Sequence, residues 1–394
     1  MLFSPEALPS TLFPHKADTV VLETAVRASC SIFIVKPRSP PEMVLKLRLR
    51  KKLMLLLFGG CCFFVIWGRM TEDKTEKDGI EWTPQHLASE IKTNITILLW
   101  YWPFGIPYSL SEDTCQKKHG ISGCRLVDNH TQYSMADVVV FHHFELKTGI
   151  QKLPLHLPRP EYQRWLWMSL EAPQSNGNLS RYAGIFNLTL SYHPGADVTV
   201  PYGKIQKKDG NAESEVFVIP KNKTHLVCWV VSNYNNHHKR TSVYEELLKL
   251  IPVQVYGRAV KKPLSQDALL PTISRCYFYL AFENSVYPHY ITEKLWRNAF
   301  TAGTVPVVLG PPRSHYEAVA PPHSFIHVND FDSIATLAKF LKDIAGDENR
   351  YRSYFSWRKT YSVKLYDDWR DRLCNICQVY GQLPSHKIYH TLEA

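Results

Sequence analysis

The sequence predicts an α/β protein with two globular halves, and three observations lead to this prediction. The chain has 394 residues, which is more than a single hydrophobic core usually organises. Its apolar runs are short and strand-like, and the connections between them are long enough to hold helices. A polar stretch over residues 203–224, rich in Lys, Asp, Asn and Glu, predicts a linker between two sets of such runs. We therefore expect two Rossmann-like domains that face a cleft.

Apolar runs that end in polar loops define the expected strands of both domains. The first domain, expected over 95–220 after a polar stem at 69–94, contains runs at 95–105, 136–143, 164–173 and 184–192. The second, expected over 221–365, contains runs at 225–233, 253–257, 276–284, 305–310 and 325–328. Apolar spacing predicts helices over 241–251, 292–302 and 333–345.

One segment predicts a membrane anchor. Residues 53–68, "LMLLLFGGCCFFVIWG", carry no charge, and "KLRLRKK" precedes them. As a helix they would span about 24 Å, enough for a thin secretory membrane, and the basic flank predicts cytoplasmic residues 1–52 with the rest of the chain lumenal. A cleaved signal peptide is the alternative, but no small-residue cleavage site follows. Residues 1–42 are either tail or an upstream extension, because Met43 opens a compact anchor.

Sequons and cysteines agree with a lumenal domain. All five sequons follow the apolar run, at Asn94, Asn129, Asn178, Asn187 and Asn222. Six cysteines lie beyond it and allow up to three disulfides: Cys115, Cys124, Cys228, Cys276, Cys374 and Cys377. The spacing of Cys374 and Cys377 also permits a redox pair or half of a zinc site.

Charge and motifs narrow the ligand class. The formal net charge of +10 suits nucleic acid, an anionic membrane face or a small anion such as a nucleotide diphosphate. The sequence contains no GxxxxGK[ST], GxGxxG, HExxH or GxSxG motif. Asp330-Phe-Asp332 is a DxD triplet of the kind found in metal-dependent glycosyltransferases. Either Asp332 or Ser333 would also serve as a helix N-cap.

Polar residues follow two expected strands of the second domain, where ligands of open α/β sheets bind. Asn233 and Arg240 follow "CWVVS", whereas Glu283, Asn284, Tyr290, Glu293 and Lys294 follow "YFYLAF". Each group offers a cation at a helix entrance, which suits a diphosphate. Alternatively, Arg240 and Lys294 are solvated surface residues and Glu293 is an ordinary first-turn acid. The residues alone indicate binding of an anionic nucleotide.

The stretch "FENSVYPHYITEKLWRNAFTAGTVPVVLGP", residues 282–311, resembles the donor-binding signature of the α-1,3-fucosyltransferases, glycosyltransferase family 10. The resemblance covers nearly all of 95–394 and includes "WPFG", "VVVFHH", "VPYG", "CWVVSN" and "DWRDRLCNIC". Three further segments, "EKLWRNAF", "LGPPRSHYEA" and "LPSHKIYHTLE", resemble the leukocyte-type branch, which modifies sialylated acceptors.

The resemblance implies a GT-B fold and a Golgi type II membrane protein with a lumenal catalytic part. It implies transfer of L-fucose from GDP-fucose, with inversion, to O3 of GlcNAc in Galβ1,4GlcNAc of glycoproteins or glycolipids. The products would be Lewis x or sialyl Lewis x structures. It implies no obligate cofactor, no metal site and no nucleic-acid partner.

The resemblance also assigns roles to residues. Glu171 matches the family's general base, with Glu283 as the alternative, and inversion in one displacement needs such a base. Arg240 and Lys294 match ligands of the diphosphate, and Glu293 matches a contact of the donor's sugar part. Further donor-pocket positions are Tyr202, Val230, Ser232, Asn233, Tyr279, Asn284 and Tyr290. The implied disulfides are Cys115–Cys374, Cys124–Cys377 and Cys228–Cys276, the first two tying a tail, 366–394, to the first domain.

The acceptor and the activity each leave an alternative open. The loop after "WPFG" lacks the glutamine that helps to hold the acceptor in some members, so acceptor preference is undecided. A catalytically silent lumenal carbohydrate-binding protein of the same fold is the alternative function, and a transferase that uses another nucleotide sugar is a third. Loss of Glu171, Arg240 or Lys294 would favour the silent protein, but all three are present.

Overall fold

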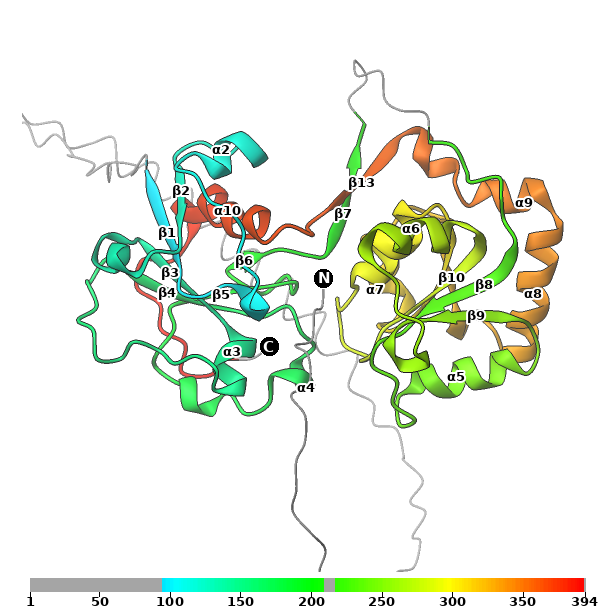
Figure 1. Ribbon diagram of the computed structural model, residues 1–394, viewed down its shortest axis with the longest axis horizontal. Helices are drawn as coiled ribbons and strands as arrows, with labels where there is room; N and C mark the ends of the chain where they lie inside the picture. Colours follow the sequence, from blue (N-terminus) through cyan, green and yellow to red (C-terminus); the bar gives the residue numbers. More distant parts are fainter. Residues whose placement is uncertain (1–93, 209–216, 393–394) are drawn as a thin grey trace, which may run out of the picture. The chain divides into compact units, whose positions relative to one another are not determined.

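The computed structural model describes residues 94–208 and 217–392, which contain two parallel β-sheets flanked by helices (Figure 1). Three predicted segments lie outside the described residues: the tail over 1–52, the membrane span at 53–68 and all of the stem except residue 94. Within the described ranges, no helix has the length and apolar character needed to span a membrane.

The N-terminal sheet has strand order β2-β1-β3-β4-β5-β6, and all of its paired strands are parallel. The predicted apolar runs form four of these strands, while β2 and β6 were not predicted. The bounds are β1 Ile95–Leu99, β2 Cys124–Val127, β3 Val138–His142, β4 Arg164–Met168, β5 Leu188–Ser191 and β6 Val198–Thr199. Short helices connect them: α2 Thr114–His119, α3 His143–Thr148 and α4 Pro173–Asn176.

The C-terminal sheet has strand order β12-β11-β10-β8-β9 and is also parallel. All five predicted runs form strands: β8 His225–Val230, β9 Val253–Tyr256, β10 Cys276–Phe282, β11 Val305–Leu309 and β12 Ile326–His327. Its helices are α5 Lys239–Leu248, α6 Gln266–Ser274, α7 Arg313–Glu317, α8 Ile334–Gly346 and α9 Glu348–Ser353. The two sheets confirm the predicted α/β class.

Both faces of the C-terminal sheet are buried, which explains why its strands read as continuous apolar runs. Along β10, Phe278 and Leu280 pack with Leu247 of α5 and Leu341 of α8. The alternate residues of β10 face the other way and pack with the helical turn η5, Lys294–Thr301. The sequence predicted a helix at 292–302, and η5 is helical but has π-helical hydrogen bonding, which is frequently found at functional sites.

The segment predicted to be a linker, 203–224, contains a strand that the sequence did not predict. Strand β7, Gly203–Lys207, pairs antiparallel with β13, Tyr361–Leu365, far away in sequence. A Cβ atom on Gly203 would lie 2.6 Å from Trp296 Cγ, so only glycine allows the backbone to pass this ring. The polar composition of β7 suits a two-stranded ribbon at an edge as well as a linker, because few side chains of β7 are buried.

The C-terminal segment is attached to the N-terminal sheet. Helix α10, Trp369–Val379, carries Cys374 and Cys377, which form disulfides with Cys115 of α2 and Cys124 of β2. Beyond α10, Lys387 Nζ lies 2.7 Å from Asp197 Oδ1. Tyr389 N–H donates to the carbonyl oxygen of Phe186. These contacts hold the last described residues beside β5.

Candidate functional site

A cleft of about 840 Å³ is lined by residues that follow strands of both sheets. From the N-terminal sheet come Ser169 and Glu171, which follow β4. From the C-terminal sheet come Ser232 and Asn233 after β8, and Asn284 after β10. Eight predicted site residues line this cleft: Glu171, Val230, Ser232, Asn233, Arg240, Asn284, Glu293 and Lys294. These residues therefore lie at or beyond the carboxyl ends of strands, where ligands of open α/β sheets bind, and their functional roles stay predictions.

Glu171 lies between β4 and α4 and lines both the large cleft and a small adjoining pocket. Burial raises the pKa of its carboxyl group, although Lys294 opposes this shift. Within residues 94–208 and 217–392, no hydrogen bond or ion pair reaches its carboxylate. A half-buried carboxylate in this state accepts a proton more readily than an exposed one, as a general base must.

Arg240 is the second residue of α5 and is 5% exposed. Its Nη1 donates to the carbonyl oxygen of Phe282 at 3.4 Å, and its Nη2 donates to that of Asn233. These bonds join the ends of β8 and β10 and fix the guanidinium plane. Nε is buried without a partner among the described residues, so the group retains a donor for an anion in the cleft.

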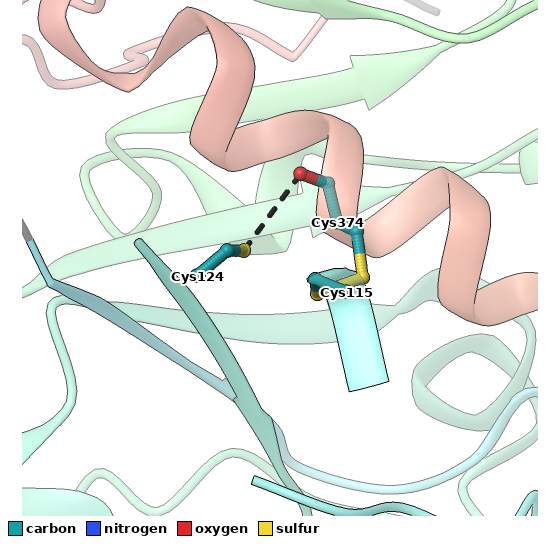
Figure 2. Close-up of side chains that lie close together, drawn as sticks. All are labelled: Cys115, Cys124 and Cys374. Carbon is teal, nitrogen blue, oxygen red and sulfur yellow. Dashed lines mark hydrogen bonds between the residues drawn. A yellow bond between two sulfur atoms is a disulfide. The ribbon is translucent and has the colours of Figure 1, made fainter. Parts of the chain in front are cut away.

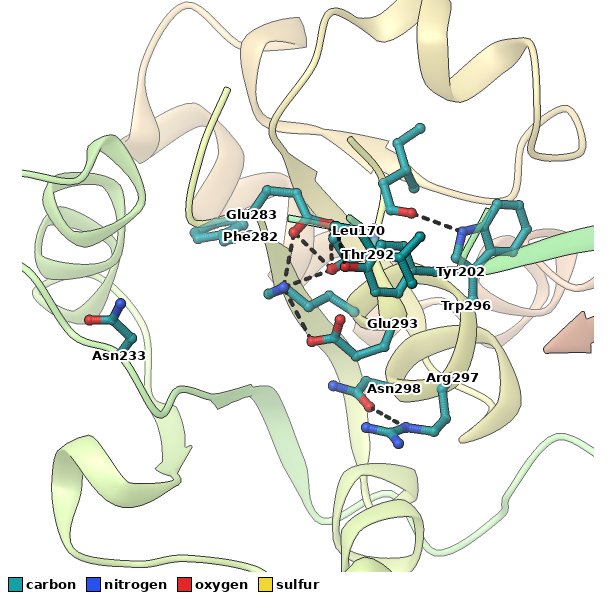
Figure 3. A network of polar contacts seen from close by, with 12 residues as sticks. Leu170, Tyr202, Asn233, Phe282, Glu283, Thr292, Glu293, Trp296, Arg297 and Asn298 are labelled. Carbon is teal, nitrogen blue, oxygen red and sulfur yellow. Dashed lines mark hydrogen bonds and ion pairs between the residues drawn. The ribbon is translucent and has the colours of Figure 1, made fainter. Parts of the chain in front are cut away.

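Glu283, Thr292, Glu293 and Lys294 form one polar network, parts of which are drawn in Figure 3. Lys294 Nζ donates to Thr292 Oγ1 at 2.7 Å and lies 2.9 Å from Glu283 Oε2 and 3.2 Å from Glu293 Oε1. The backbone N–H of Thr292 donates to Glu283 Oε1 at 2.8 Å. All three ammonium protons of Lys294 thus face acceptors within the protein.

The two acids of this network differ in their environment. The side chain of Glu283 is 0% exposed, and burial raises its pKa even though Lys294 lowers it. For Glu293, burial would raise the pKa, but nearby cations, Lys294 first and Arg297 after it, together lower the pKa to about 2. Glu283 does not line the cleft, whereas Glu293 does, with Oε2 buried and unpaired in the described part of the chain. Glu283 therefore orients Lys294, and its position does not support the alternative role of base.

Sequence comparisons assign the family. A profile described as "Fucosyltransferase, N-terminal" matches residues 92–203, and one described as "Glycosyltransferase family 10 (fucosyltransferase) C-term" matches 220–394. The mouse protein alpha-(1,3)-fucosyltransferase 7 is 44% identical over 339 residues, 86% of this chain and 82% of the relative. This chain belongs to glycosyltransferase family 10.

Other relatives of this family 10 chain give similar values. Human alpha-(1,3)-fucosyltransferase 7 is 46% identical over 300 residues, 76% of this chain and 85% of the relative. Bovine 4-galactosyl-N-acetylglucosaminide 3-alpha-L-fucosyltransferase 9 is 43% identical over 298 residues, 76% of this chain and 81% of the relative. A crystal structure of an alpha1,3-fucosyltransferase with GDP-fucose is 16% identical, with a TM-score of 0.48 over 82% of this chain and 96% of that one.

Three predicted donor-pocket tyrosines lie outside the lining of the large cleft in this family 10 chain. Tyr202 lines the small pocket beside Glu171, and its hydroxyl donates to the carbonyl oxygen of Leu170 at 2.7 Å. Tyr279 accepts from Asn298 Nδ2 at 3.0 Å and is 0% exposed. Tyr290 is equally buried and packs against Tyr192. Their part in donor binding stays a prediction.

The cleft also contains charged residues that the sequence motifs did not single out. Arg297 lies three residues after Lys294 on η5, so helical spacing could have identified it. Lys147 of α3 also lines the cleft, and its Nζ donates to the carbonyl oxygen of Ser175 at 2.5 Å. Asp367 belongs to the C-terminal segment and lies 4.0 Å from Arg297. Only the fold brings Lys147 and Asp367 to the same cavity.

The cysteines pair as the family resemblance implied: Cys115–Cys374, Cys124–Cys377 and Cys228–Cys276. Three sulfur atoms, of Cys115, Cys124 and Cys374, lie within 4.8 Å of one another (Figure 2). Because Cys374 and Cys377 each have a different partner, the alternatives of a redox pair between them and half a zinc site do not describe this structure.

Two minor sequence features also have defined places. Ser333 is the N-cap of α8, since its Oγ accepts from the Thr336 N–H at 3.1 Å, and Asp330 pairs with Arg313. The DxD triplet does not line the cleft.

Four sequon asparagines are exposed, at Asn94, Asn129, Asn178 and Asn222. Asn187 is half-buried: its Oδ1 accepts from Trp165 N–H, and its Nδ2 donates to the carbonyl oxygen of Lys387. Glycosylation at the five sequons stays a prediction.

Proposed function

We propose that this family 10 chain is an α-1,3-fucosyltransferase that moves L-fucose from GDP-fucose, with inversion, to O3 of GlcNAc in Galβ1,4GlcNAc. The observation that carries this proposal is one cleft lined by both a carboxylate of raised pKa and two buried cations. Glu171 comes from the N-terminal sheet, while Arg240 and Lys294 come from the C-terminal sheet. The printed names of the relatives support the same donor sugar and linkage.

The proposed chemistry is a single displacement. The carboxylate of Glu171 takes the proton of the acceptor O3–H while O3 forms a bond to C1 of fucose. The bond between C1 and the β-phosphate oxygen breaks on the opposite face, and its electron pair leaves with GDP. Arg240 and Lys294 stabilise the negative charge that develops on the diphosphate.

Donor binding requires a rearrangement of the Lys294 contacts, because all three of its N–H donors are already used. Its contact with Glu293, at 3.2 Å, is the longest of the three. If Glu293 turns to the hydroxyls of the donor's sugar part, it releases one Lys294 proton for the diphosphate. The unpaired Oε2 of Glu293 supports this exchange, since a buried acceptor without a donor is unfavourable.

We further propose that the two sheets belong to a GT-B fold and that the protein is a Golgi type II membrane protein. Its acceptors would be glycoproteins or glycolipids that carry N-acetyllactosamine, with products of the Lewis x or sialyl Lewis x type. The relatives named alpha-(1,3)-fucosyltransferase 7 agree with the resemblance to the leukocyte-type branch. This supports a sialylated acceptor.

The test is a transfer assay with the full-length chain in membranes of cells that lack this activity. Labelled GDP-fucose is supplied with Galβ1,4GlcNAc, with and without α2,3-linked sialic acid. We expect fucose on O3 of GlcNAc, with preference for the sialylated acceptor, and transfer that is about 10²- to 10⁴-fold slower with Glu171→Gln. GDP-fucose binding without transfer to either acceptor would contradict the proposal and favour the silent carbohydrate-binding alternative.

A further inference from the structure

The loop that carries Glu171 is held by side chains that the proposed chemistry does not use. This loop, residues 169–176, follows β4 and includes the short helix α4. The backbone N–H of Glu171 donates to Ser169 Oγ at 3.3 Å, and Ser169 Oγ donates to Asn176 Oδ1 at 2.8 Å. Asn176 and Ser169 are both buried, at 2% and 3% exposure. The two ends of the loop are therefore tied together directly beneath Glu171.

His143 anchors the same loop to the sheet. Trp167 Nε1–H, which can only donate, donates to His143 Nδ1 at 3.1 Å. The other ring nitrogen of His143, Nε2, must then carry the proton, and it donates to the carbonyl oxygen of Asn176 at 2.8 Å. Burial lowers the pKa of His143 to about 4, so it stays neutral and both bonds persist at physiological pH. Asn176 is fixed by its backbone as well as by its side chain.

One half of the Asn176 amide is left without a partner. Its oxygen is occupied by Ser169, whereas its nitrogen, Nδ2, is buried and meets no acceptor in the part of the chain that the structure describes. The residue lines the cleft beside Ser169 and Glu171. A buried amide N–H without an acceptor is unfavourable, so its persistence in a cleft indicates an acceptor atom on the ligand.

We propose that Asn176 fixes the Glu171 loop through its oxygen and donates a hydrogen bond through Nδ2 to an oxygen of the acceptor sugar. The inference rests on the proposed function and adds a residue that forms a hydrogen bond with the acceptor sugar. Asn176 and Glu171 belong to one loop of the N-terminal sheet, while the diphosphate ligands Arg240 and Lys294 belong to the C-terminal sheet. A hydrogen bond from this loop is therefore made to the sugar whose hydroxyl Glu171 deprotonates.

Two substitutions separate the two roles of Asn176. Asn176→Asp keeps an oxygen for Ser169 but removes the donor, and Asn176→Ala removes both without adding charge. We expect each to raise the acceptor KM about tenfold, the loss of one hydrogen bond, with an unchanged dissociation constant for GDP. Asn176→Ala should in addition lower kcat, because it also removes the bond from Ser169. Ser169→Ala leaves Nδ2 intact but loosens the loop, so it should lower kcat more than it raises the acceptor KM. Asn329→Asp, an exposed change outside the cleft, is the matched control.

The contact itself is tested with N-acetyllactosamine acceptors that lack one hydroxyl at a time. The wild-type chain should lose about tenfold in kcat/KM with the acceptor that lacks the bonded oxygen, and Asn176→Ala should lose nothing further with that acceptor. Additive losses for every deoxy acceptor, or a change confined to the KM for GDP-fucose, would overturn the inference. If the wild-type chain transfers fucose normally and the variants match it, the inference fails while the proposed function stands. If the wild-type chain transfers no fucose, the proposed function itself fails.

Discussion

The charged side chains on the two sides of the cleft have opposite environments. On the proposed donor side, Lys294 contacts Glu283, Glu293 and Thr292, so the charges of these two acids and of Lys294 have partners before any ligand binds. On the proposed acceptor side, Glu171 is half-buried, and no ion pair reaches it from the rest of the described chain. Partners hold Lys294 and Glu293 in their ionised forms, whereas burial, with a smaller contribution from Glu293, raises the pKa of Glu171 against the opposing effect of Lys294.

The difference matches the tasks proposed for the two sides. A ligand of a diphosphate must stay charged throughout the reaction, and neighbouring acids raise the pKa of Lys294 although burial lowers it. A general base must lose and regain a proton, and a partner that held its charged form would make that exchange harder. Changes on either side of the cleft should therefore have different consequences, and the strongest is expected at Glu171.

Substitution of Glu171 by Gln should abolish most of the turnover and leave the donor side intact. We expect kcat to fall about 10²- to 10⁴-fold, the usual contribution of a positioned base, with an unchanged dissociation constant for GDP. Transfer kinetics and calorimetric titration with GDP measure the two effects. Because burial raises the pKa of Glu171, its ionised form opposes folding above the ordinary pKa of Glu, so the variant's Tm at neutral pH should be equal or higher. Normal turnover would show that another group is the base.

Substitution of Lys294 by Met should lower both stability and GDP affinity. It leaves the buried carboxylate of Glu283 unpaired, which costs about 3–5 kcal/mol for a buried ion pair. Chemical unfolding measures this cost. The double variant Lys294→Met with Glu283→Gln should recover most of the stability but none of the GDP affinity. Recovery of both would mean that Lys294 serves only the fold.

Substitution of Arg240 by Lys should weaken GDP binding about tenfold while the fold persists. Lysine keeps the charge, but its single ammonium nitrogen cannot reproduce the planar fork that bonds the carbonyl oxygens of Phe282 and Asn233 and directs a third N–H elsewhere. Titration with GDP gives the affinity, and the matched change Arg313→Lys, on the exposed surface away from the cleft, serves as the control. Equal affinity in wild type and Arg240→Lys would remove Arg240 from the diphosphate site.

The weakest of these effects concerns the pH dependence of kcat/KM, which reports the pKa values of the free enzyme. A base of raised pKa is protonated, and therefore inactive, up to a higher pH than an ordinary glutamate. The acidic limb of the kcat/KM profile should lie above the usual pKa of Glu, and activity should fall as pH falls through it. In Glu283→Gln the limb should remain, because Glu283 is not the base. Disappearance of the limb in Glu283→Gln would reverse this assignment.

Strand runs and strand ends were the most predictable features. Runs such as 276–284 became strands because continuous apolar sequence suits a sheet that is buried on both faces. Glu171, Arg240 and Lys294 follow strand ends that line one cleft, as the sequence suggested. The strand β7 was missed because half-buried ribbons and linkers share a polar composition. The π-helical form of η5 was missed because apolar spacing does not distinguish it over so short a segment.

The amino-acid order alone was enough to establish the α/β class, the candidate residues and, through the family resemblance, the cysteine pairs, because apolar period and motif order are local properties. The folded structure was needed to distinguish the acid buried beneath Lys294 from the one that faces the cleft, since Glu283 and Glu171 both follow apolar strands. The folded structure was also needed to find the unpaired Nδ2 of Asn176 near Glu171. This finding depends on His143 and Ser169, which bond the backbone and side-chain oxygens of Asn176 and leave Nδ2 without a partner among the described residues. Burial and hydrogen-bond partners depend on side chains that are distant in sequence, and these set the pKa values and free donors of the cleft.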